Sequence, residues 1–446
     1  MRWVASLLAL GLMMALFHRV TAGGPLEARA TLALGFLLLA GYLGGSLAAR
    51  ARLPRLTGYL LVGFAVGPAW LGLVRRDEVD ALRFIAEAAV ALIALAAGSE
   101  LTIASLSHGR AALARLATGA IIGPFLTVSL VLLTVSRWFP VTVHHPLGDA
   151  IAVALALGAL AAASSPVVSM ALVSEFDARG PFAQTLLTVT VIKDVAVAIL
   201  FTLALAAGKA AARAGALNGA VAANAILEVA GSLAVGAILG GVLAQYLRLV
   251  RGDTALLLVA TALVTAEVAR LAQLETIIVA LAAGFSLEHF APVESERLRR
   301  GVKRGSPLVS LTYFALAGAG LRLGALAELW PWVFLLVGLR AVGLRAGLRW
   351  AGRHLGAAPA LARDGWLGFI SQAGIALGLA QIARRAFPAW GVSLEALVVA
   401  MIGVHELIGP ICFRRGLVRA GEIAEGTADG ARPVDAEAIV ATRDDR

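Results

Sequence analysis

Two charged residues stand side by side in the middle of an apolar stretch, and they are the first candidates for chemistry in this chain. Lys193 and Asp194 lie about eleven residues into an apolar run near 182–206, so a helix rising 1.5 Å per residue would place them near the midplane of a bilayer. A charged side chain there costs on the order of 3 kcal/mol, so it should face protein or a water-filled cavity and serve a function. A structural ion pair is the alternative, but sequence neighbours do not face one another on a helix.

A proline preceded by two serines interrupts the apolar run near 150–174. In the sequence Ser164-Ser165-Pro166 the proline lacks a backbone donor and clashes with the preceding turn, while serine hydroxyls can satisfy the freed carbonyls. We therefore expect the helix to break here, and a simple proline kink is the alternative. The N–H and C=O groups that a broken helix exposes near the midplane coordinate small ions or substrates.

The run near 366–386 is interrupted by Ser371-Gln372-Ala373-Gly374, which is polar and glycine-bearing where a continuous helix would use Leu and Ala. In order along the chain this run is the twelfth, and the run with the proline is the fifth. Two spans an odd number apart run in opposite directions, so we expect the broken pair to be related by inverted topology. The same relation pairs 182–206 with 392–413.

Arg340 is the third charged residue that lies deep in an apolar run. It stands about ten residues into the run near 330–350, whereas Arg345 and Arg349 are nearer its cytoplasmic end and can extend to the interface. We expect Arg340 to meet a carboxylate or the carbonyl groups of a broken helix. A functional role and a purely structural pairing are both open.

Other charged and polar residues in the apolar runs are weaker candidates. Glu267, deep in the run near 254–270, is a second titratable candidate, and a hydrogen-bonded structural carboxylate is the alternative. Thr190 is an accessory candidate for the ion site. His405 and Glu406 are adjacent in the last run, where we expect a structural role.

The composition identifies the kind of element that must position these residues. Of 446 residues, 60% are hydrophobic and only 15% are charged, which excludes a soluble globular protein. The 48 glycines suit helices packed closely in lipid. A membrane-crossing helix needs about 20 apolar residues, so we predict an all-α polytopic membrane protein with thirteen spans. The spans lie near 27–48, 56–74, 84–99, 111–136, 150–174, 182–206, 218–247, 254–270, 275–289, 307–325, 330–350, 366–386 and 392–413.

The two ends of the chain differ from this pattern. Residues 1–22 resemble a signal peptide cut after Ala22, and an uncleaved fourteenth helix is the alternative. Basic residues gather in the loops after odd-numbered spans, so the thirteen-span unit should start outside and end in the cytoplasm. The tail, 416–446, is expected to be disordered and cytoplasmic.

The charge and cysteine content exclude several partners and sites. The net charge of +10 is distributed in short clusters between apolar runs, which favours the lipid bilayer rather than nucleic acid as partner. The single cysteine, Cys412, excludes a disulfide framework within the chain and a Cys-based metal site.

Several of these segments, taken in order, carry a resemblance to a known family. Over residues 27–415 the chain resembles a bacterial monovalent cation:proton antiporter, of the group that contains sodium/proton exchangers and potassium-efflux antiporters. The segments are Gly58-Tyr-Leu-Leu-Val-Gly-Phe-Ala-Val-Gly67-Pro68, Gly98-Ser-Glu100-Leu, Ser164-Ser165-Pro166, Ala178-Arg-Gly-Pro181, Val191-Ile-Lys193-Asp194, Tyr313-Phe-Ala-Leu-Ala-Gly318 and Leu339-Arg340-Ala-Val-Gly343.

The resemblance implies a sodium/proton-antiporter-like fold in the bacterial cytoplasmic (inner) membrane. Each protomer of a homodimer would divide into a mobile core, here about 111–206 and 330–413, and a dimerisation domain formed by the remaining helices. The core would contain two crossing broken helices. Asp194 would bind a proton and a transient Na⁺ or K⁺ in turn, and Arg340 would neutralise acidic charge in the empty site. No cofactor is implied.

Lys193 departs from the family pattern, because related chains usually carry Asp or Asn at this position. With one carrier carboxylate, Asp194 would exchange one proton for one cation and the cycle would be electroneutral. Alternatively, Lys193 itself titrates and releases a proton when a cation arrives. A tethered ammonium could also occupy the place of a bound sodium ion.

We therefore predict a secondary antiporter in which proton and cation compete for one carboxylate. One alternative is a permease for an anion or small organic solute bound by Lys193 and Arg340, and another is a non-transporting membrane sensor with the same fold. An enzyme is not expected, because the sequence shows no Ser/His or double-Asp arrangement placed for intramembrane catalysis. The expected ion- and proton-binding residues are Asp194, Lys193, Arg340, Ser164, Ser165 and Gln372, with Glu267 and Thr190 as accessory candidates.

Overall fold

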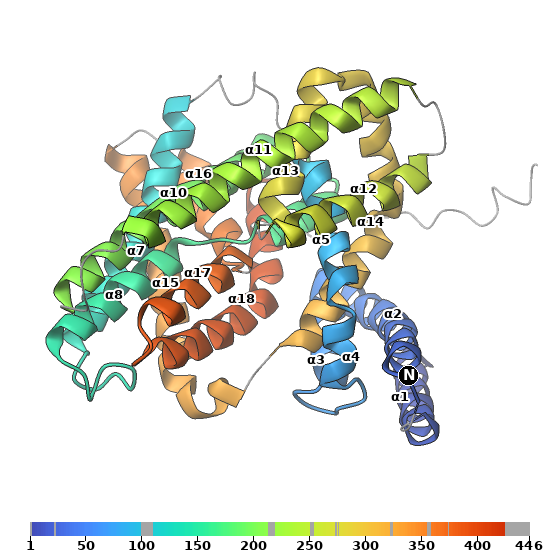
Figure 1. The fold of residues 1–446 in the computed structure, drawn as a ribbon, viewed down its shortest axis with the longest axis horizontal. Helices are drawn as coiled ribbons and strands as arrows, with labels where there is room; N and C mark the ends of the chain where they lie inside the picture. The colour runs from blue at the N-terminus through green and yellow to red at the C-terminus, as the bar shows by residue number, and fades with distance from the viewer. Residues whose placement is uncertain are drawn as a thin grey trace, which may run out of the picture.

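A computed structural model describes residues 2–21, 24–99, 110–212, 219–249, 254–272, 274, 276–321, 324–354, 358–372 and 374–423. Within these ranges the chain forms helices and connecting turns without any strand, in agreement with the all-α prediction (Figure 1). Three predicted features lie outside the described residues: the cleavage point at Ala22, the acidic residue Glu100 and the tail from residue 424.

The helices follow one another along the chain with short connections. The first ten are α1 (Arg2–Val20), α2 (Leu26–Arg50), α3 (Arg55–Val66), α4 (Arg76–Ala81), α5 (Arg83–Gly98), α7 (Arg110–Thr134), α8 (Leu147–Ala162), α9 (Pro166–Glu175), α10 (Pro181–Ala211) and α11 (Gly219–Leu249). They are followed by α12 (Thr254–Leu271), α13 (Thr276–Phe290), α14 (Pro292–Gly320), α15 (Gly324–His354), α16 (Pro359–Asp364), the 3₁₀ helix η1 (Gly365–Phe369), α17 (Gly374–Ala386) and α18 (Gly391–Arg419). Because α1 is helical, both expectations for residues 1–22 are still open.

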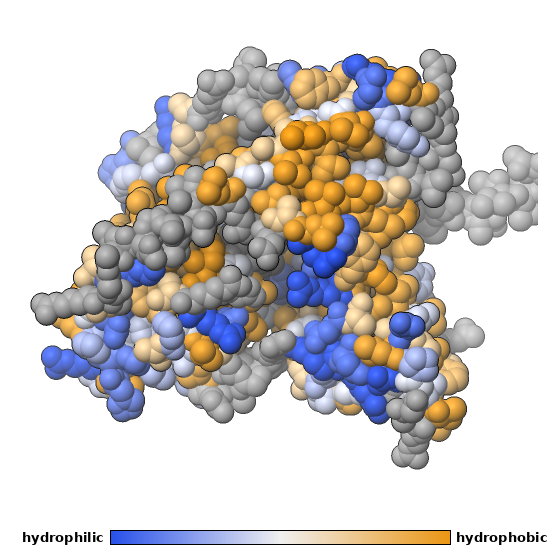
Figure 2. Space-filling view, in the orientation of Figure 1, coloured by the Kyte–Doolittle hydropathy of each residue, from blue (hydrophilic) through white to orange (hydrophobic). Residues whose placement is uncertain are grey.

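Many of these helices have the length and composition of membrane spans. In the described part of the chain, seven helical stretches are long and apolar enough to cross a bilayer, and four shorter helices are also apolar. Large apolar side chains such as Val259, Leu263 and Val264 of α12 are exposed, and Figure 2 shows a wide hydrophobic area on the face that carries α12 and α13. Exposed apolar surface of this extent is expected where helices face lipid.

The second predicted span, 56–74, is shorter in the structure. The helix α3 ends at Val66, and Gly67 has an extended backbone with φ −70° and ψ 177°. The cause is Pro68, because a proline disfavours helical geometry in the residue before it. The chain then turns and forms the separate short helix α4.

A predicted loop is helical in the structure. We expected residues 290–306 to connect two spans, but α14 begins at Pro292 and continues through Pro307 to Gly320. Proline is favoured in the first turn of a helix, and Glu296 pairs with Arg299 and Arg300 at the spacings that stabilise a helix surface. Charge pairing therefore extends the helix beyond its apolar part.

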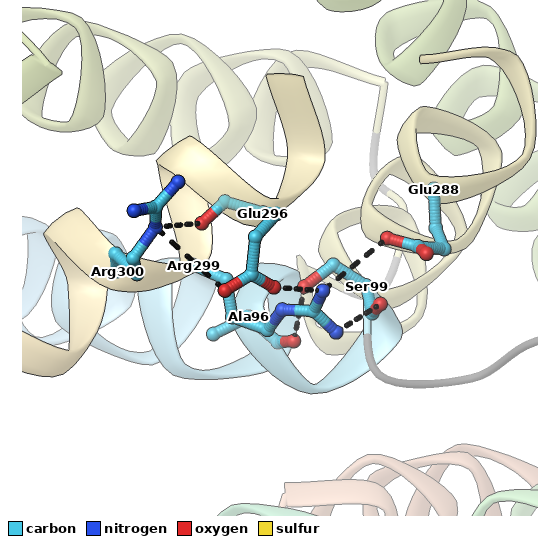
Figure 3. Close-up of polar contacts among 6 residues, drawn as sticks. All are labelled: Ala96, Ser99, Glu288, Glu296, Arg299 and Arg300. Atoms are coloured by element: carbon cyan, nitrogen blue, oxygen red, sulfur yellow. Dashed lines mark hydrogen bonds and ion pairs between the residues drawn. The ribbon is translucent and has the colours of Figure 1, made fainter. Parts of the chain in front are cut away.

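Arg299 of α14 makes contacts that join three helices (Figure 3). Its guanidinium donates to the carbonyl of Ser99 at the end of α5 over 3.3 Å and lies 3.8 Å from the carboxylate of Glu288 in α13. The Ser99 hydroxyl donates in turn to the carbonyl of Ala96. These contacts connect α5 and α13 to the charged N-terminal half of α14.

The last helix extends beyond its predicted end at residue 413. It continues to Arg419, and Glu422 then accepts hydrogen bonds from the backbone N–H groups of Phe182 and Ala183 over 2.6 and 3.0 Å. These are free donors of the first turn of α10, where a carboxylate is favoured. The predicted disordered tail, 416–446, thus begins with an ordered segment that caps the helix of Lys193 and Asp194.

The helices pack in two groups. One contains α7, α8, α10, α15, α17 and α18, and the other contains α2, α3, α5, α11, α12, α13 and α14. In Figure 1, α17 and α18 lie on the left of the view, and α2 and α3 lie on the right. The first group contains α10, which carries Lys193 and Asp194, and α15, which carries Arg340.

Glycines bring α7 and α15 into backbone contact. A Cβ at Gly347 would lie 2.0 Å from the carbonyl oxygen of Gly119, and a Cβ at Gly123 would lie 2.2 Å from that of Gly343. Gly343 and Gly347 are four residues apart on α15, a spacing that allows this close approach. The contact begins one turn after Arg340 and fixes the position of that residue.

We expect Gly347→Ala to lower the thermal stability of the protein in detergent, because the added methyl group must separate α7 from α15. Overpacking of this kind costs about 1–3 kcal/mol. Gly338→Ala is the matched control, since no atom lies within 4 Å of a Cβ at that position of the same helix. Equal melting temperatures for the two variants would contradict the close-contact interpretation.

Candidate functional site

The first predicted break is a full interruption of the helix. The helix α8 ends at Ala162, Ala163 is extended with φ −64° and ψ 149°, and α9 begins at Pro166. Ser165 caps α9, since its hydroxyl accepts a hydrogen bond from the N–H of Val168 over 3.4 Å. The proline thus starts a new helix, and the simple kink that we considered is excluded.

The second break lies between η1 and α17. The 3₁₀ helix ends at Phe369, the residues 370–372 are not helical, and α17 starts at Gly374. The chain therefore passes through the interior without helical hydrogen bonds at two places that are about 200 residues apart in sequence. Backbone groups released in this way need partners, because leaving them unpaired in an apolar interior costs several kcal/mol each.

The two breaks supply partners to each other. We call residues 160–166 together with residues 369–372 the crossover. Hydrogen bonds join its two segments. The N–H of Ser165 donates to the carbonyl of Ser371 (2.9 Å), and the hydroxyl of Ser164 donates to the carbonyl of Phe369 (3.1 Å). The side-chain Nε2 of Gln372 donates to the carbonyl of Leu160 (2.7 Å). Ser164, Ser165 and Gln372, which were predicted separately, therefore meet at one place.

Arg340 holds both sides of the crossover. Its side chain is completely buried and donates four hydrogen bonds to backbone carbonyls. The acceptors are Ala161 (2.8 Å), Ala163 (2.5 Å), Phe369 (2.8 Å) and Ile370 (2.6 Å). These carbonyls belong to the ends of α8 and η1, where helical acceptors have no intrahelical partner and the helix dipole favours a cation. Of the two partners we considered for Arg340, the structure shows the carbonyls.

Lys193 reaches the crossover from α10. Its side chain is completely buried, and its ammonium donates to the hydroxyl of Ser164 over 2.8 Å. The same Nζ lies 4.3 Å from the ring centroid of Phe369, within the range of a cation–π contact. Asp194 follows directly and is 6% exposed. Arg340 and Asp194 are the charged groups that act electrostatically on Lys193.

Two accessory candidates are not part of this arrangement. The hydroxyl of Thr190 donates to the carbonyl of Leu186, one turn earlier in its own helix. Glu267 is not the deeply buried group that its position in the sequence indicated, because its side chain is 39% exposed and pairs with Arg270. Its helix, α12, packs on α5, α13 and α14 in the other helix group.

Sequence reasoning missed the groups that contact Arg340 and Lys193. The four carbonyl acceptors are backbone atoms of alanine, phenylalanine and isoleucine, which carry no chemical signature in the sequence. The ring of Phe369 beneath the ammonium is also one of many aromatic side chains in apolar runs. The only available signal was the pair of helix breaks, since each break must leave carbonyls without partners.

Comparison with known proteins gives consistent results. The family model described as "Sodium/hydrogen exchanger, transmembrane" matches residues 31–409. Among solved structures, the sodium proton antiporter MjNhaP1 from Methanocaldococcus jannaschii at pH 8 has a TM-score of 0.60 and 16% identity, and the match covers 90% of this chain and 97% of that chain.

A second structure of the same antiporter, from electron microscopy, has a TM-score of 0.65 and 16% identity, covering 87% of this chain and 96% of that chain. At this identity the likeness shows the fold alone. A comparison with curated protein sequences gives no match.

We expect Arg340→Gln to destabilise the folded protein strongly, because carbonyls at both breaks lose their donors. Removing one partner from a buried charged network costs about 3–5 kcal/mol. Arg340→Lys should recover only part of this stability, since an ammonium cannot reproduce the planar set of donors. Thermal unfolding in detergent measures both, with Arg349→Gln, at an exposed position of the same helix, as control. A melting temperature for Arg340→Gln equal to that of the control would show that the crossover does not need this side chain.

Proposed function

Because the chain belongs to the sodium/hydrogen exchanger family, we propose that it exchanges a monovalent cation, Na⁺ or K⁺, for protons by competition of both ions for Asp194. The family is one of transporters, so the protein is a membrane transporter and not an enzyme. The observation that carries the assignment to Asp194 is its position beside Lys193, buried next to the crossover.

Competition for one carboxylate provides the coupling. Asp194 is 6% exposed, and its ionised carboxylate can bind either a proton or a cation. Both cannot occupy the carboxylate together. A movement of the core that requires one of them therefore exchanges the two ions.

Lys193 distinguishes this site from one with two adjacent carboxylates. Its ammonium is held by Ser164 in the crossover and already balances one negative charge. The pair Lys193-Asp194 contains one carboxylate instead of two. We therefore propose that one cation is exchanged for one proton without net charge movement. The alternative, in which Lys193 releases a proton when the cation arrives, differs in its response to membrane potential.

The larger arrangement follows from the same proposal. Thirteen spans would include an inverted pair of broken helices, and the core helices of 111–206 and 330–413 would move against a dimerisation domain in a homodimer. The packing of α7, α8, α10, α15, α17 and α18 as one group supports this division. Location in the bacterial inner membrane with a cytoplasmic C-terminus is part of the proposal, supported by the basic loops.

A permease that binds an anion with Lys193 and Arg340 is the main alternative. It would need donors that are available to the anion, but Arg340 donates four hydrogen bonds to carbonyls of the crossover. The guanidinium has five N–H groups in total, so little of its donor capacity is left for a ligand. The geometry therefore favours a structural role for Arg340 and a cation site at Asp194.

We expect Asp194→Asn to reduce cation-driven proton flux to the level of protein-free vesicles, because an amide cannot exchange a proton for a cation. The assay uses proteoliposomes with an internal pH dye and inward gradients of Na⁺ or K⁺. Asp177→Asn, an exposed carboxylate in the loop before α10, is the matched control and should transport like the wild type. Undiminished flux in Asp194→Asn would refute the proposed site, and a wild type that responds to neither cation would favour the permease or the non-transporting sensor.

We expect wild-type sodium–proton exchange to proceed at the same rate under an imposed membrane potential of either sign, because one cation replaces one proton. Lys193→Asp changes the local charge by two units and adds a second carboxylate, so exchange by this variant should depend on the potential. Sodium-driven flux under potassium diffusion potentials measures the difference. A potential-dependent wild type would instead support a titrating Lys193.

A further inference from the structure

One carboxylate connects the helix that leaves the crossover to a helix of the second group. Glu175 is the last residue of α9, and its Oε1 accepts a hydrogen bond from the backbone N–H of Arg55 over 2.6 Å. Arg55 is the first residue of α3 and lies 120 positions away in sequence. The helix α9 therefore starts in the crossover at Pro166 and is bound to α3 at its other end.

The position of Glu175 in its own helix does not stabilise that helix. A helix C-terminus carries a partial negative charge and favours Lys or Arg, so a carboxylate in the last turn is unfavourable there. The stabilised helix is α3. Its N-cap residue is Pro54, which has no side-chain oxygen and makes no capping hydrogen bond. Glu175 supplies an acceptor for a backbone N–H that has no partner within α3.

Two arginines lie around this carboxylate. Arg55 of α3 and Arg414 of α18 both act electrostatically on Glu175. Because α18 packs against α3 and against α9, the three helices meet at one place. In the orientation that the basic loops favour, this place lies at the cytoplasmic end of the bundle.

The helix that receives the contact is fixed to its neighbours by glycines. A Cβ at Gly58 would lie 2.3 Å from the carbonyl oxygen of Gly44 in α2, and a Cβ at Gly63 would lie 2.2 Å from that of Ala315 in α14. Backbones in direct contact leave no space for one helix to move without the others. The helix α3 therefore keeps its place relative to α2 and α14.

We propose that the contact between Glu175 and the first turn of α3 is a latch, which holds the conformation described here and must open for the crossover to move. The proposed function requires the core helices of 111–206, which include α9, to move against the remaining helices, which include α3. Because α9 starts in the crossover, such a movement separates Glu175 from the N–H of Arg55. This inference rests on the proposed exchange and adds to it the contact that resists each movement of the core.

Cross-linking tests whether the latch must open. In a Cys412→Ser background, Arg55→Cys combined with Glu175→Cys places two thiols across the latch, and a short bis-methanethiosulfonate reagent joins them reversibly. Sodium-driven proton flux in proteoliposomes should fall in proportion to the linked fraction, which mass spectrometry measures. A reductant that cleaves the link should restore the flux.

Gly180→Cys combined with Glu422→Cys is the matched control in the same background. Glu422 also accepts a hydrogen bond from a backbone N–H at a helix start, that of Phe182 over 2.6 Å, and a Cβ at Gly180 would lie 2.5 Å from its Cγ. This contact joins α10 to the segment after α18, within the first helix group, so its cross-link should leave the flux unchanged.

Two results of the cross-linking experiment would overturn the inference. One is flux that persists in the linked Arg55→Cys and Glu175→Cys protein, and the other is failure of these two positions to link. A wild type without cation-driven flux would instead overturn the proposed function, so the two failures are distinguishable.

Hydrogen–deuterium exchange in detergent examines the latch without transport. Glu175→Ala removes the acceptor, so the peptide that contains the N–H of Arg55 should exchange about fivefold faster than in the wild type, as expected for the loss of a helix cap. Asp177→Asn, at an exposed position in the loop that follows α9, is the control and should exchange like the wild type. Unchanged exchange in Glu175→Ala would also overturn the inference.

Discussion

The hydrogen bonds from Arg340 to the ends of two interrupted helices are the interaction on which the rest of this structure depends. A helix that stops inside an apolar interior leaves carbonyl groups that cannot turn to water, and each costs several kcal/mol if it is unpaired. One guanidinium has enough donors, in a fixed plane, to serve carbonyls of α8 and of η1 together. It allows two breaks to exist side by side, at the cost of a buried positive charge.

That charge determines which other groups the interior can contain. Lys193 contributes a second positive charge, and Asp194 beside it is a buried carboxylate. Charges in a medium of low dielectric interact strongly. A site with Lys193 and Asp194 therefore differs by two units of side-chain charge from one with two adjacent ionised carboxylates.

Close helix packing keeps this arrangement in place. The glycines of α7 and α15 bring the two backbones into contact one turn from Arg340. This contact fixes the position of the guanidinium opposite the carbonyls of the crossover. Glu422 caps the first turn of α10 and thereby connects the segment after α18 to the helix of Lys193 and Asp194. In the second helix group, Arg299 of α14 connects this helix to the C-terminal ends of α5 and α13.

The sequence alone determined the helical class, the break at Pro166 and the depth of Lys193, Asp194 and Arg340, because apolar length and proline sterics act over a few residues. It left the partner of Arg340 open between carboxylates and carbonyls, and it gave Glu267 a depth that it does not have. Only the tertiary structure decided these points, since the contacts join segments about 200 residues apart. The cost of burying a charge can be estimated from its neighbours in sequence, but the group that compensates it depends on how distant helices pack.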